Sequence, residues 1–263
     1  MRRIWIVLTA ICLVLTSAAF FVGCERLHIL VGSGKTVNQD FSFTDFTRIS
    51  AGGTFNVEVI QGAAYSVNVT VDDNLQSYLE VTKDGDTLKV GMRKSYSYNS
   101  THLKAVVTMP RLVVFDLSGV SKGSVSGFNL TDDFILNVSE ASQANFTGMV
   151  VNKLTLDISG ASRANGSVNA SGNASLQASG ASTITLSGKA VDADIESSGA
   201  STVNLTDFLV RDARVNVSGA SNATVSATGT LSGDVSGASH LYYTGTPTLG
   251  SIHTSGASSV NKK

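Results

Sequence analysis

The sequence predicts an all-β protein built as a parallel β-helix, a solenoid with coils of about 20 residues. Three observations support this fold. The motif SGAS, with the variants SGVS and SEAS, occurs eight times, and its first serines lie 18 to 21 residues apart. Apolar and polar residues alternate around each motif. The composition, with 25 Gly, 2 Pro and abundant Val, Thr, Ser and Asn, favours strands and turns over helices.

The first segment, residues 1–23, has the layout of a bacterial export signal or membrane anchor. Arg2 and Arg3 precede an apolar run that ends at Gly23, and Cys24 follows directly. A cysteine in this place is typical of a lipoprotein, so Cys24 is the expected lipid anchor. Cleavage after the letters TSAA, or an uncleaved run that spans the membrane, stays open. We expect a protein of the cell envelope or cell surface, and two of the three outcomes tether it to the membrane.

Residues 24–40 are expected to be a tether, and residues 41–263 one β-helical domain. Its entry part, 41–102, is less regular, although stretches such as GTFNVEVIQG and DTLKVGM alternate like strands. DDNLQSYLE predicts a single helical turn, and residues 94–102 an exposed loop or hairpin tip. The second part, 103–263, carries the SGAS repeats.

Alignment of the eight motif copies on their first serine gives three columns of inward-facing residues. Two columns lie three residues and one residue before the serine, a spacing that puts them on one face of a strand. A third follows the motif. The columns are Phe115, Leu136, Leu156, Leu176, Ile195, Val215, Gly233 and Ile252; Leu117, Val138, Ile158, Ala178, Ser197, Val217, Val235 and Thr254; and Val125, Phe146, Gly166, Leu186, Leu205, Val225 and Tyr243. Each repeat is therefore expected to form two or three short strands that only neighbouring repeats can cover.

The SGAS motif itself predicts a corner of the coil. Glycine tolerates a positive φ, the small Ala and Ser allow corners to stack closely, and serine hydroxyls can bond to the local backbone. A row of nucleophilic serines is the opposing interpretation, but a serine nucleophile needs a base and an orienting group beside it. The histidines, His28, His102, His240 and His253, do not recur with the repeat.

One outward column combines acids and amides. The residues two before each first serine are Asp116, Asn137, Asp157, Gln177, Glu196, Asn216 and Asp234, followed by His253. Acid and amide alternate through Asn216, which separates the like charges of stacked coils and lets an amide donate to its neighbour. The column is predicted to be either a solvated, charge-spaced row or a binding ribbon for cations or sugar hydroxyls.

Other chemistry finds little support in the sequence. No phosphate loop, metal-spaced Cys/His cluster or GxSxG elbow occurs, so no cofactor and no metal are expected. Without residues 1–23, 17 basic residues face 20 acidic ones, a net charge near −3 that disfavours nucleic acid. An enzyme that acts on polysaccharides stays open as an alternative, because such enzymes use clustered carboxylates. The sequence has two candidate pairs, Asp132 with Asp133 and Asp192 with Asp194.

The chain resembles the head GIN domain family, described as heads of auto-transporter adhesins and found in bacterial envelope proteins and lipoproteins. The resemblance runs from about Val31 to the C-terminus, through GSGKTV, FTRISAGGTFNVEVIQG, VDDNLQSYLEVTKDGDTLKVGM and the recurring SGAS. Its residues are Phe46, Ile49, Gly53, Phe55, Val57, Gln61, Gly62, Asn74, Leu75, Gly85 and Leu88. It implies a right-handed β-helix at the cell surface and supplies no catalytic residues.

The expected function is binding rather than catalysis. We expect a tethered extracytoplasmic β-helix that serves as an adhesin, an envelope scaffold or a binding module, with an envelope protein or a glycan as its partner. The alternative is a lyase or hydrolase that acts on polysaccharides with surface carboxylates, which would need a concave site and carboxyl groups of shifted pKa.

Overall fold

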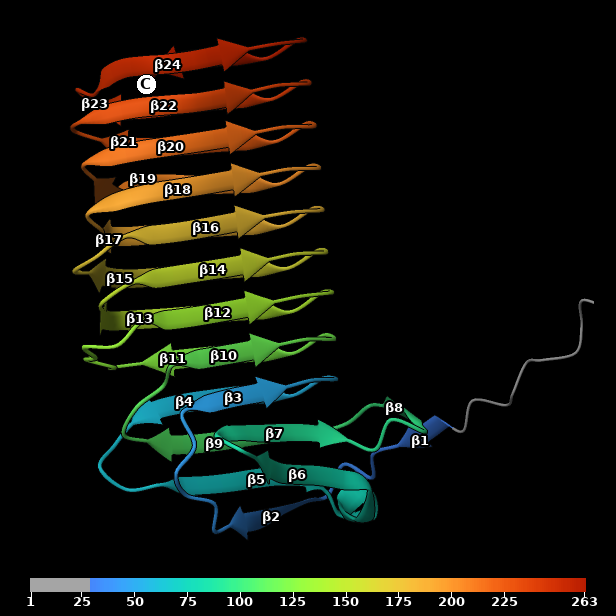
Figure 1. Ribbon diagram of the computed structural model, residues 1–263. Helices are drawn as coiled ribbons and strands as arrows, with labels where there is room; N and C mark the ends of the chain where they lie inside the picture. The colour runs from blue at the N-terminus through green and yellow to red at the C-terminus, as the bar shows by residue number, and fades with distance from the viewer. Residues whose placement is uncertain (1–28) are drawn as a thin grey trace, which may run out of the picture.

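The computed structural model describes residues 29–263, which form a β-solenoid of about seven turns. Two large sheets face each other, and each turn of the repeat region gives one strand to each sheet (Figure 1). The strands of the nearer sheet run to the right and those behind run to the left while the chain rises, which makes the solenoid right-handed. The predicted all-β fold with coils of roughly 20 residues is confirmed.

We call the nearer sheet of Figure 1 the front sheet and the other the back sheet. The front sheet contains, in spatial order, β24 (Thr248–Thr254), β22 (Thr230–Val235), β20 (Asp212–Val217), β18 (Asp192–Ser197), β16 (Ala174–Ala178), β14 (Leu154–Ile158), β12 (Phe134–Val138), β10 (Val114–Leu117), β3 (Arg48–Ala51), β7 (Thr87–Met92) and β6 (Leu79–Asp84). The back sheet contains β2 (Thr36–Phe41), β5 (Ser66–Asp72), β9 (Lys104–Met109), β4 (Asn56–Gln61), β11 (Lys122–Ser126), β13 (Gln143–Val151), β15 (Arg163–Ala170), β17 (Thr183–Lys189), β19 (Thr202–Val210), β21 (Asn222–Ala227), β23 (His240–Gly245) and β25 (Ser259–Lys262).

The core lies between the two sheets and is filled by the predicted inward columns. Leu136, Leu156 and Leu176, for example, pair in register on successive strands and are all buried. The third column has a glycine, Gly166, at a position where its other members are mostly apolar. The Phe146 ring of the turn below fills the space that a side chain would need, because a Cβ at Gly166 would lie 1.9 Å from that ring. In the last turn described, Thr254 is exposed, since no further coil covers it.

The SGAS motifs are the corners that join each front strand to the next back strand. The glycine of every SGAS and SGVS copy has a positive φ, between 72° and 79°, as the motif predicts. The SEAS copy places Glu140 in the same conformation, with a φ of 65°. The corners stack through hydrogen bonds from the third residue of one copy to the second residue of the copy below, for example from Ala181 N to Gly160 O at 2.7 Å.

The structure corrects two predictions about the entry part. The expected tether, residues 24–40, contains β1 (Ile29–Val31) and most of β2, and β2 pairs antiparallel with β5 in the back sheet. Residues 94–102, expected as a loop or hairpin tip, contain β8 (Ser97–Asn99), which pairs in parallel with β1. Both pairings join segments far apart in the sequence, which local alternation does not reveal. The predicted helical turn is present as a 3-10 helix over Asp73–Tyr78.

Residues 1–28, with the predicted signal and the candidate lipid anchor Cys24, lie outside the described part of the chain. Within the described part, no helix has the length and apolar character needed to cross a membrane.

Candidate functional site

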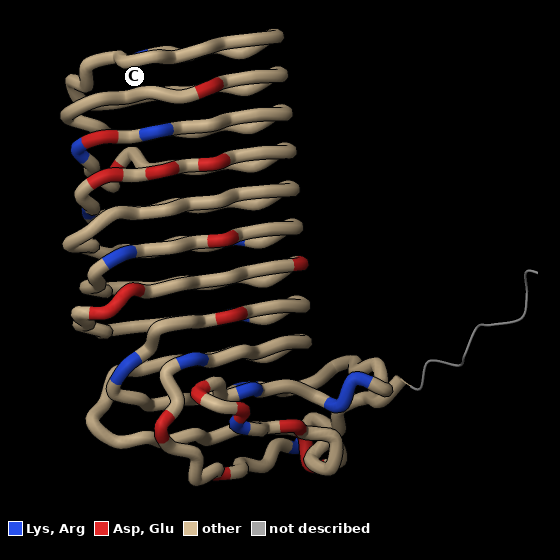
Figure 2. The backbone as a smooth tube through the Cα atoms, viewed as in Figure 1, with Lys and Arg blue, Asp and Glu red and all other residues tan. Residues whose placement is uncertain are grey.

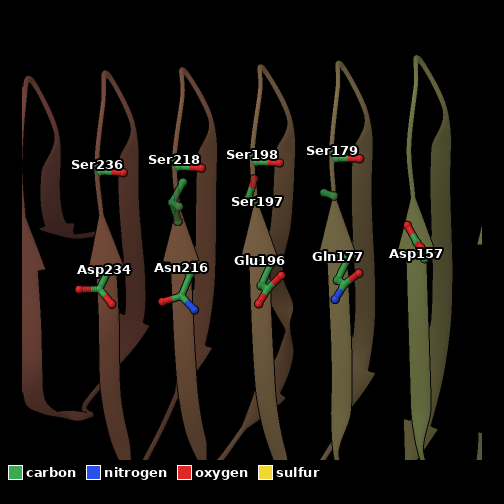
Figure 3. Close-up of a pocket in the computed structure, with 12 residues that line it drawn as sticks. Asp157, Gln177, Ser179, Glu196, Ser197, Ser198, Asn216, Ser218, Asp234 and Ser236 are labelled. Atoms are coloured by element: carbon green, nitrogen blue, oxygen red, sulfur yellow. The ribbon is translucent and has the colours of Figure 1, made fainter.

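The seven polar residues of the outward column lie side by side on the front sheet. The strand register pairs each member with the next one along the stack. We call this line the ladder; its members are Asp116, Asn137, Asp157, Gln177, Glu196, Asn216 and Asp234. Figure 3 shows the five members from Asp157 to Asp234 on neighbouring strands. The structure therefore brings all the predicted members together on one face.

Most ladder side chains have no partner among residues 29–263, the described part of the chain. Asn137 Nδ2 donates a hydrogen bond to Asp116 Oδ1 at 2.6 Å, the acid-to-amide contact that the alternation predicts. The four exposed members have no side-chain hydrogen bond or ion pair to any described residue. Asn216 Oδ1 is shielded from solvent and also lacks a partner within the described residues. The acceptors of the four exposed members, Asp157, Gln177, Glu196 and Asp234, are therefore available to a ligand.

A row of serines runs parallel to the ladder. The first serines of four SGAS motifs, Ser179, Ser198, Ser218 and Ser236, follow the ladder residues by two positions and lie beside them (Figure 3). Together the two rows line a shallow hollow of about 270 Å³. Carboxylates, amides and hydroxyls thus recur at the spacing of stacked coils, roughly 4.8 Å. Such a surface offers many hydrogen bonds to a polar polymer and little apolar contact.

The last serines of the motifs have a structural role. Those of the first seven copies are buried, and Ser201 illustrates their contacts. Its Oγ lies 2.8 Å from Ser198 O and 3.1 Å from Ala178 O, so the hydroxyl ties its own corner to the turn below. No imidazole lies in this network, which agrees with the predicted corner and not with a row of nucleophiles.

Three of the carboxylates that suggested a polysaccharide-acting enzyme, Asp132, Asp133 and Asp192, are held in local bonds at the bends opposite the corners. Asp194 lies exposed on β18, with no hydrogen bond or ion pair to a described residue. Asp132 accepts hydrogen bonds from the guanidinium of Arg111. Asp133 Oδ1 accepts one from Asn152 Nδ2 at 2.7 Å. Asp192 Oδ2 accepts one from Arg211 at 2.9 Å. These carboxylates stabilise the bends, and no three metal-ligating side chains cluster anywhere in the described chain.

A larger hollow, of about 620 Å³, was missed by the sequence analysis. It lies at the N-terminal end of the stack, where the β1–β8 pair projects as an arm beyond the corners (Figure 1). Tyr96 and Tyr98 line it from the arm, and Gly119 and Glu140 line it from the corners. We call it the arm hollow. Its signals in the sequence were the two tyrosines of KSYSYNSTH and the glutamate that replaces glycine in SEAS.

Fold and surface together define a β-solenoid that presents a repeated polar row on one sheet. The chain belongs to the family described as "putative auto-transporter adhesin, head GIN domain", whose model matches residues 45–247. The family resemblance drawn from the sequence is thereby confirmed.

Solved structures of the same architecture include three proteins from Parabacteroides species. A putative adhesin from Parabacteroides merdae has a TM-score of 0.82 at 20% identity, over 90% of this chain and 99% of that one. A putative adhesin from Parabacteroides distasonis has a TM-score of 0.80 at 20% identity, over 89% and 100%. A protein of the same species named a putative lipid binding protein has a TM-score of 0.76 at 20% identity, over 89% and 99%. These likenesses establish the fold alone. Comparison with curated proteins finds no match.

Proposed function

We propose that this chain is an extracytoplasmic, membrane-tethered binding module of the adhesin type that holds a glycan along the ladder. The observation that carries the proposal is the in-register row of carboxylates and amides, whose exposed members have no partner among the described residues. A repeated row of acceptors with a parallel row of hydroxyls suits a polymer whose hydroxyl groups also repeat. The family description supports an adhesin role.

The charge of the surface favours a neutral polymer. The ladder carries four acids and no base, and each acid would repel a phosphate or sulfate group. Nucleic acid is disfavoured for the same reason. Sugar hydroxyls, in contrast, can donate to carboxylates and amide oxygens without a charge of their own.

Catalysis is no part of the proposal. An enzyme that cleaves glycans uses one carboxyl group with a raised pKa to protonate the leaving oxygen. The carboxyl groups of the described chain whose pKa departs clearly from the ordinary value have it lowered. The hydrogen bond from Lys89 lowers the pKa of Asp84, and the backbone N–H of Thr230 lowers that of Asp212. Such groups stay ionised and are poor proton donors.

Membrane attachment rests on the N-terminal sequence. Arg2, Arg3 and the apolar run to Gly23, followed by Cys24, support export and lipid attachment at Cys24. A lipid anchor there would hold the described domain close to the membrane, because Ile29 already belongs to β1.

A polysaccharide pull-down tests the proposal. Residues 25–263 are incubated with a panel of insoluble and immobilised glycans, and both retained protein and released fragments are measured. The ladder variant Asp157→Asn/Glu196→Gln should lose retention. The control Asp207→Asn/Glu58→Gln removes the same charge from the back sheet and should keep it. Equal retention of the two variants would contradict the ladder as the binding site, and release of fragments would show an enzyme.

A further inference from the structure

The arm hollow has the shape of a site for a single ligand group. The arm meets the stack of corners at an angle, and the hollow of about 620 Å³ lies between them. Its rim includes Val120, an apolar side chain that is 60% exposed. Backbone of the glycine corners at Gly53 and Gly119 forms part of the wall. This larger hollow with an apolar side chain at its rim differs from the shallower, polar surface along the ladder.

Three of the six tyrosines of the chain are gathered at the arm. The rings of Tyr78 and Tyr96 meet edge to face, with centroids 4.9 Å apart, and Tyr78 and Tyr98 do so at 6.4 Å. Tyr98 OH donates a hydrogen bond to Arg93 O at 2.8 Å, and the Arg93 guanidinium lies 5.9 Å from the Tyr78 ring centre. The aromatic wall is therefore fixed before any ligand arrives, which lowers the entropy lost on binding.

Glu140 gives independent support, because it is strained where it lines the hollow. It is the only one of the eight motif corners whose second residue carries a side chain at positive φ. The corner bond from Ala141 N to Gly119 O is 2.9 Å long, whereas the equivalent bonds of the other corners measure 2.6 to 2.7 Å. Figure 2 shows an acidic position among otherwise uncharged corners. A strained residue retained where glycine fits better indicates a role other than stability.

The hollow also holds charges that can meet a ligand. Lys94 and Glu140 line it, and neither side chain has an ion-pair partner among the described residues. Arg93 and Lys89, by contrast, are paired with Glu80 and Asp84. Figure 2 shows basic positions in the arm. One unpaired cation and one unpaired carboxylate therefore flank the aromatic wall.

The ladder leads into this hollow. In the strand register Asp116 pairs with Ser50, and Ser50 pairs with Lys89, so the outward column continues from the ladder to the floor of the hollow. A chain bound along the ladder would thus bring its end to the tyrosines. At this point the column carries Lys89, which is paired with Asp84, in place of the acids of the ladder.

We propose that the arm hollow binds the terminal sugar of a glycan, and that this sugar is a pyranose with a carboxylate group. The apolar face of the ring packs on Tyr96 and Tyr98, Glu140 accepts hydrogen bonds from ring hydroxyls, and Lys94 meets the carboxylate. The inference rests on the proposed function in that both sites take glycans. It adds the chemistry of the terminal residue and a second site with its own residues.

Calorimetric titration of the full-length chain in detergent tests the inference. The probes are an oligosaccharide of neutral sugars capped by one terminal glucuronic acid and the same oligosaccharide ending in glucose, which is neutral throughout. The acid-ended probe should bind more tightly. Tyr96→Ala should weaken both about tenfold, because stacking is lost. Lys94→Gln should bring the acid-ended probe to the affinity of the neutral one, and Lys83→Gln, a charge control outside the hollow, should change neither.

Glu140→Gly separates binding from folding. It relieves the strained corner, so it should raise the thermal midpoint and yet weaken both probes about tenfold. Failure of both probes to bind, equal affinity for the two, or unchanged affinity in Tyr96→Ala and Glu140→Gly would overturn the inference. The ladder variant distinguishes the two proposals. If only the ladder variant loses binding, the ladder proposal holds and the arm hollow proposal is refuted. If only the hollow variants lose binding, the arm hollow proposal holds and the ladder proposal is refuted.

Discussion

The corner glycines allow a quantitative test of what holds the turns together. Gly180, in the middle of the stack, has a φ of +73°, and a Cβ built on it would lie 2.6 Å from the carbonyl oxygen of Gly160 in the turn below. Gly127, in a bend opposite the corners, has a nearly equal φ of +76°, but a Cβ there would meet no atom within 4 Å. The two glycines differ in contact and not in conformation.

The substitutions Gly180→Ala and Gly127→Ala therefore separate two effects. Both place a Cβ in the left-handed region, at a loss of about 1 to 2 kcal/mol in the free energy of unfolding. Gly180→Ala also forces a methyl group against fixed backbone, which costs about 1 to 3 kcal/mol more. The expected losses are roughly 1 to 2 kcal/mol at Gly127 and roughly 2 to 5 kcal/mol at Gly180.

Urea denaturation followed by circular dichroism measures both losses. The same difference should appear as a lower thermal midpoint, by about 2 to 4 °C for each kcal/mol. Hydrogen exchange should place the extra opening of Gly180→Ala at the corners next to it, because each turn of a solenoid contacts only its neighbours. Equal losses at the two sites would refute the argument that close stacking, and not backbone conformation alone, requires glycine at the corners.

Four further predictions concern single residues. Glu140→Gly should raise the free energy of unfolding by about 1 kcal/mol, because relief of the left-handed conformation exceeds the added freedom of the unfolded chain; no gain in urea denaturation would show an unstrained corner. Burial alone would raise the pKa of Asp72, but hydrogen bonds from the backbone N–H groups of His102 and Gly34 and from the His102 ring lower this pKa below 3.8. The ionised Asp72 therefore stabilises the fold fully above pH 3.8, and this stabilisation is lost as the pH falls through the lowered pKa. Asp72→Asn should lose about 3 kcal/mol at neutral pH and flatten the acid limb of the stability curve; an unchanged acid limb would contradict this. Ser201→Ala should lose about 1 to 2 kcal/mol, whereas Ser162→Ala should be nearly neutral because the Ser162 hydroxyl has no partner in the described chain, and equal thermal midpoints would argue against the hydroxyl network. Cys24→Ser should move the protein from the membrane fraction to the soluble extracytoplasmic fraction, and retention in the membrane would indicate an uncleaved anchor.

The fold of the repeat region could be predicted from the sequence because its residues contact equivalent positions of the neighbouring repeats. The neighbour of each residue across the sheet is the same position of the next repeat, about 20 residues away, so a column of the alignment is also a column of the structure. Leu156 and Ile158 are buried and Asp157 between them is exposed, as the alternation predicts. The same logic placed the ladder members in one line and the glycines at the corners.

The arm hollow could not be predicted from the sequence, because it depends on strand pairings outside the repeats. Ile29–Val31 pairs with Ser97–Asn99, although these segments lie far apart in the chain and each is three residues long. Asp72 fastens the same region by accepting hydrogen bonds from Gly34 and His102. Short strands without alternation carry no register signal, so their pairing follows only from the shape of the stack beneath them.

The sequence by itself thus determined the coil, its inward columns, its corners and the ladder, because period and alternation fix which positions stack. Only the tertiary structure brought Tyr96 of the entry part and Glu140 of the repeat region to the lining of one hollow. It also decided that each turn has two strands and that the segment expected to be a tether joins the sheet. Those features arise from contacts between non-repeating segments, whose energy depends on the folded surface and not on the local sequence.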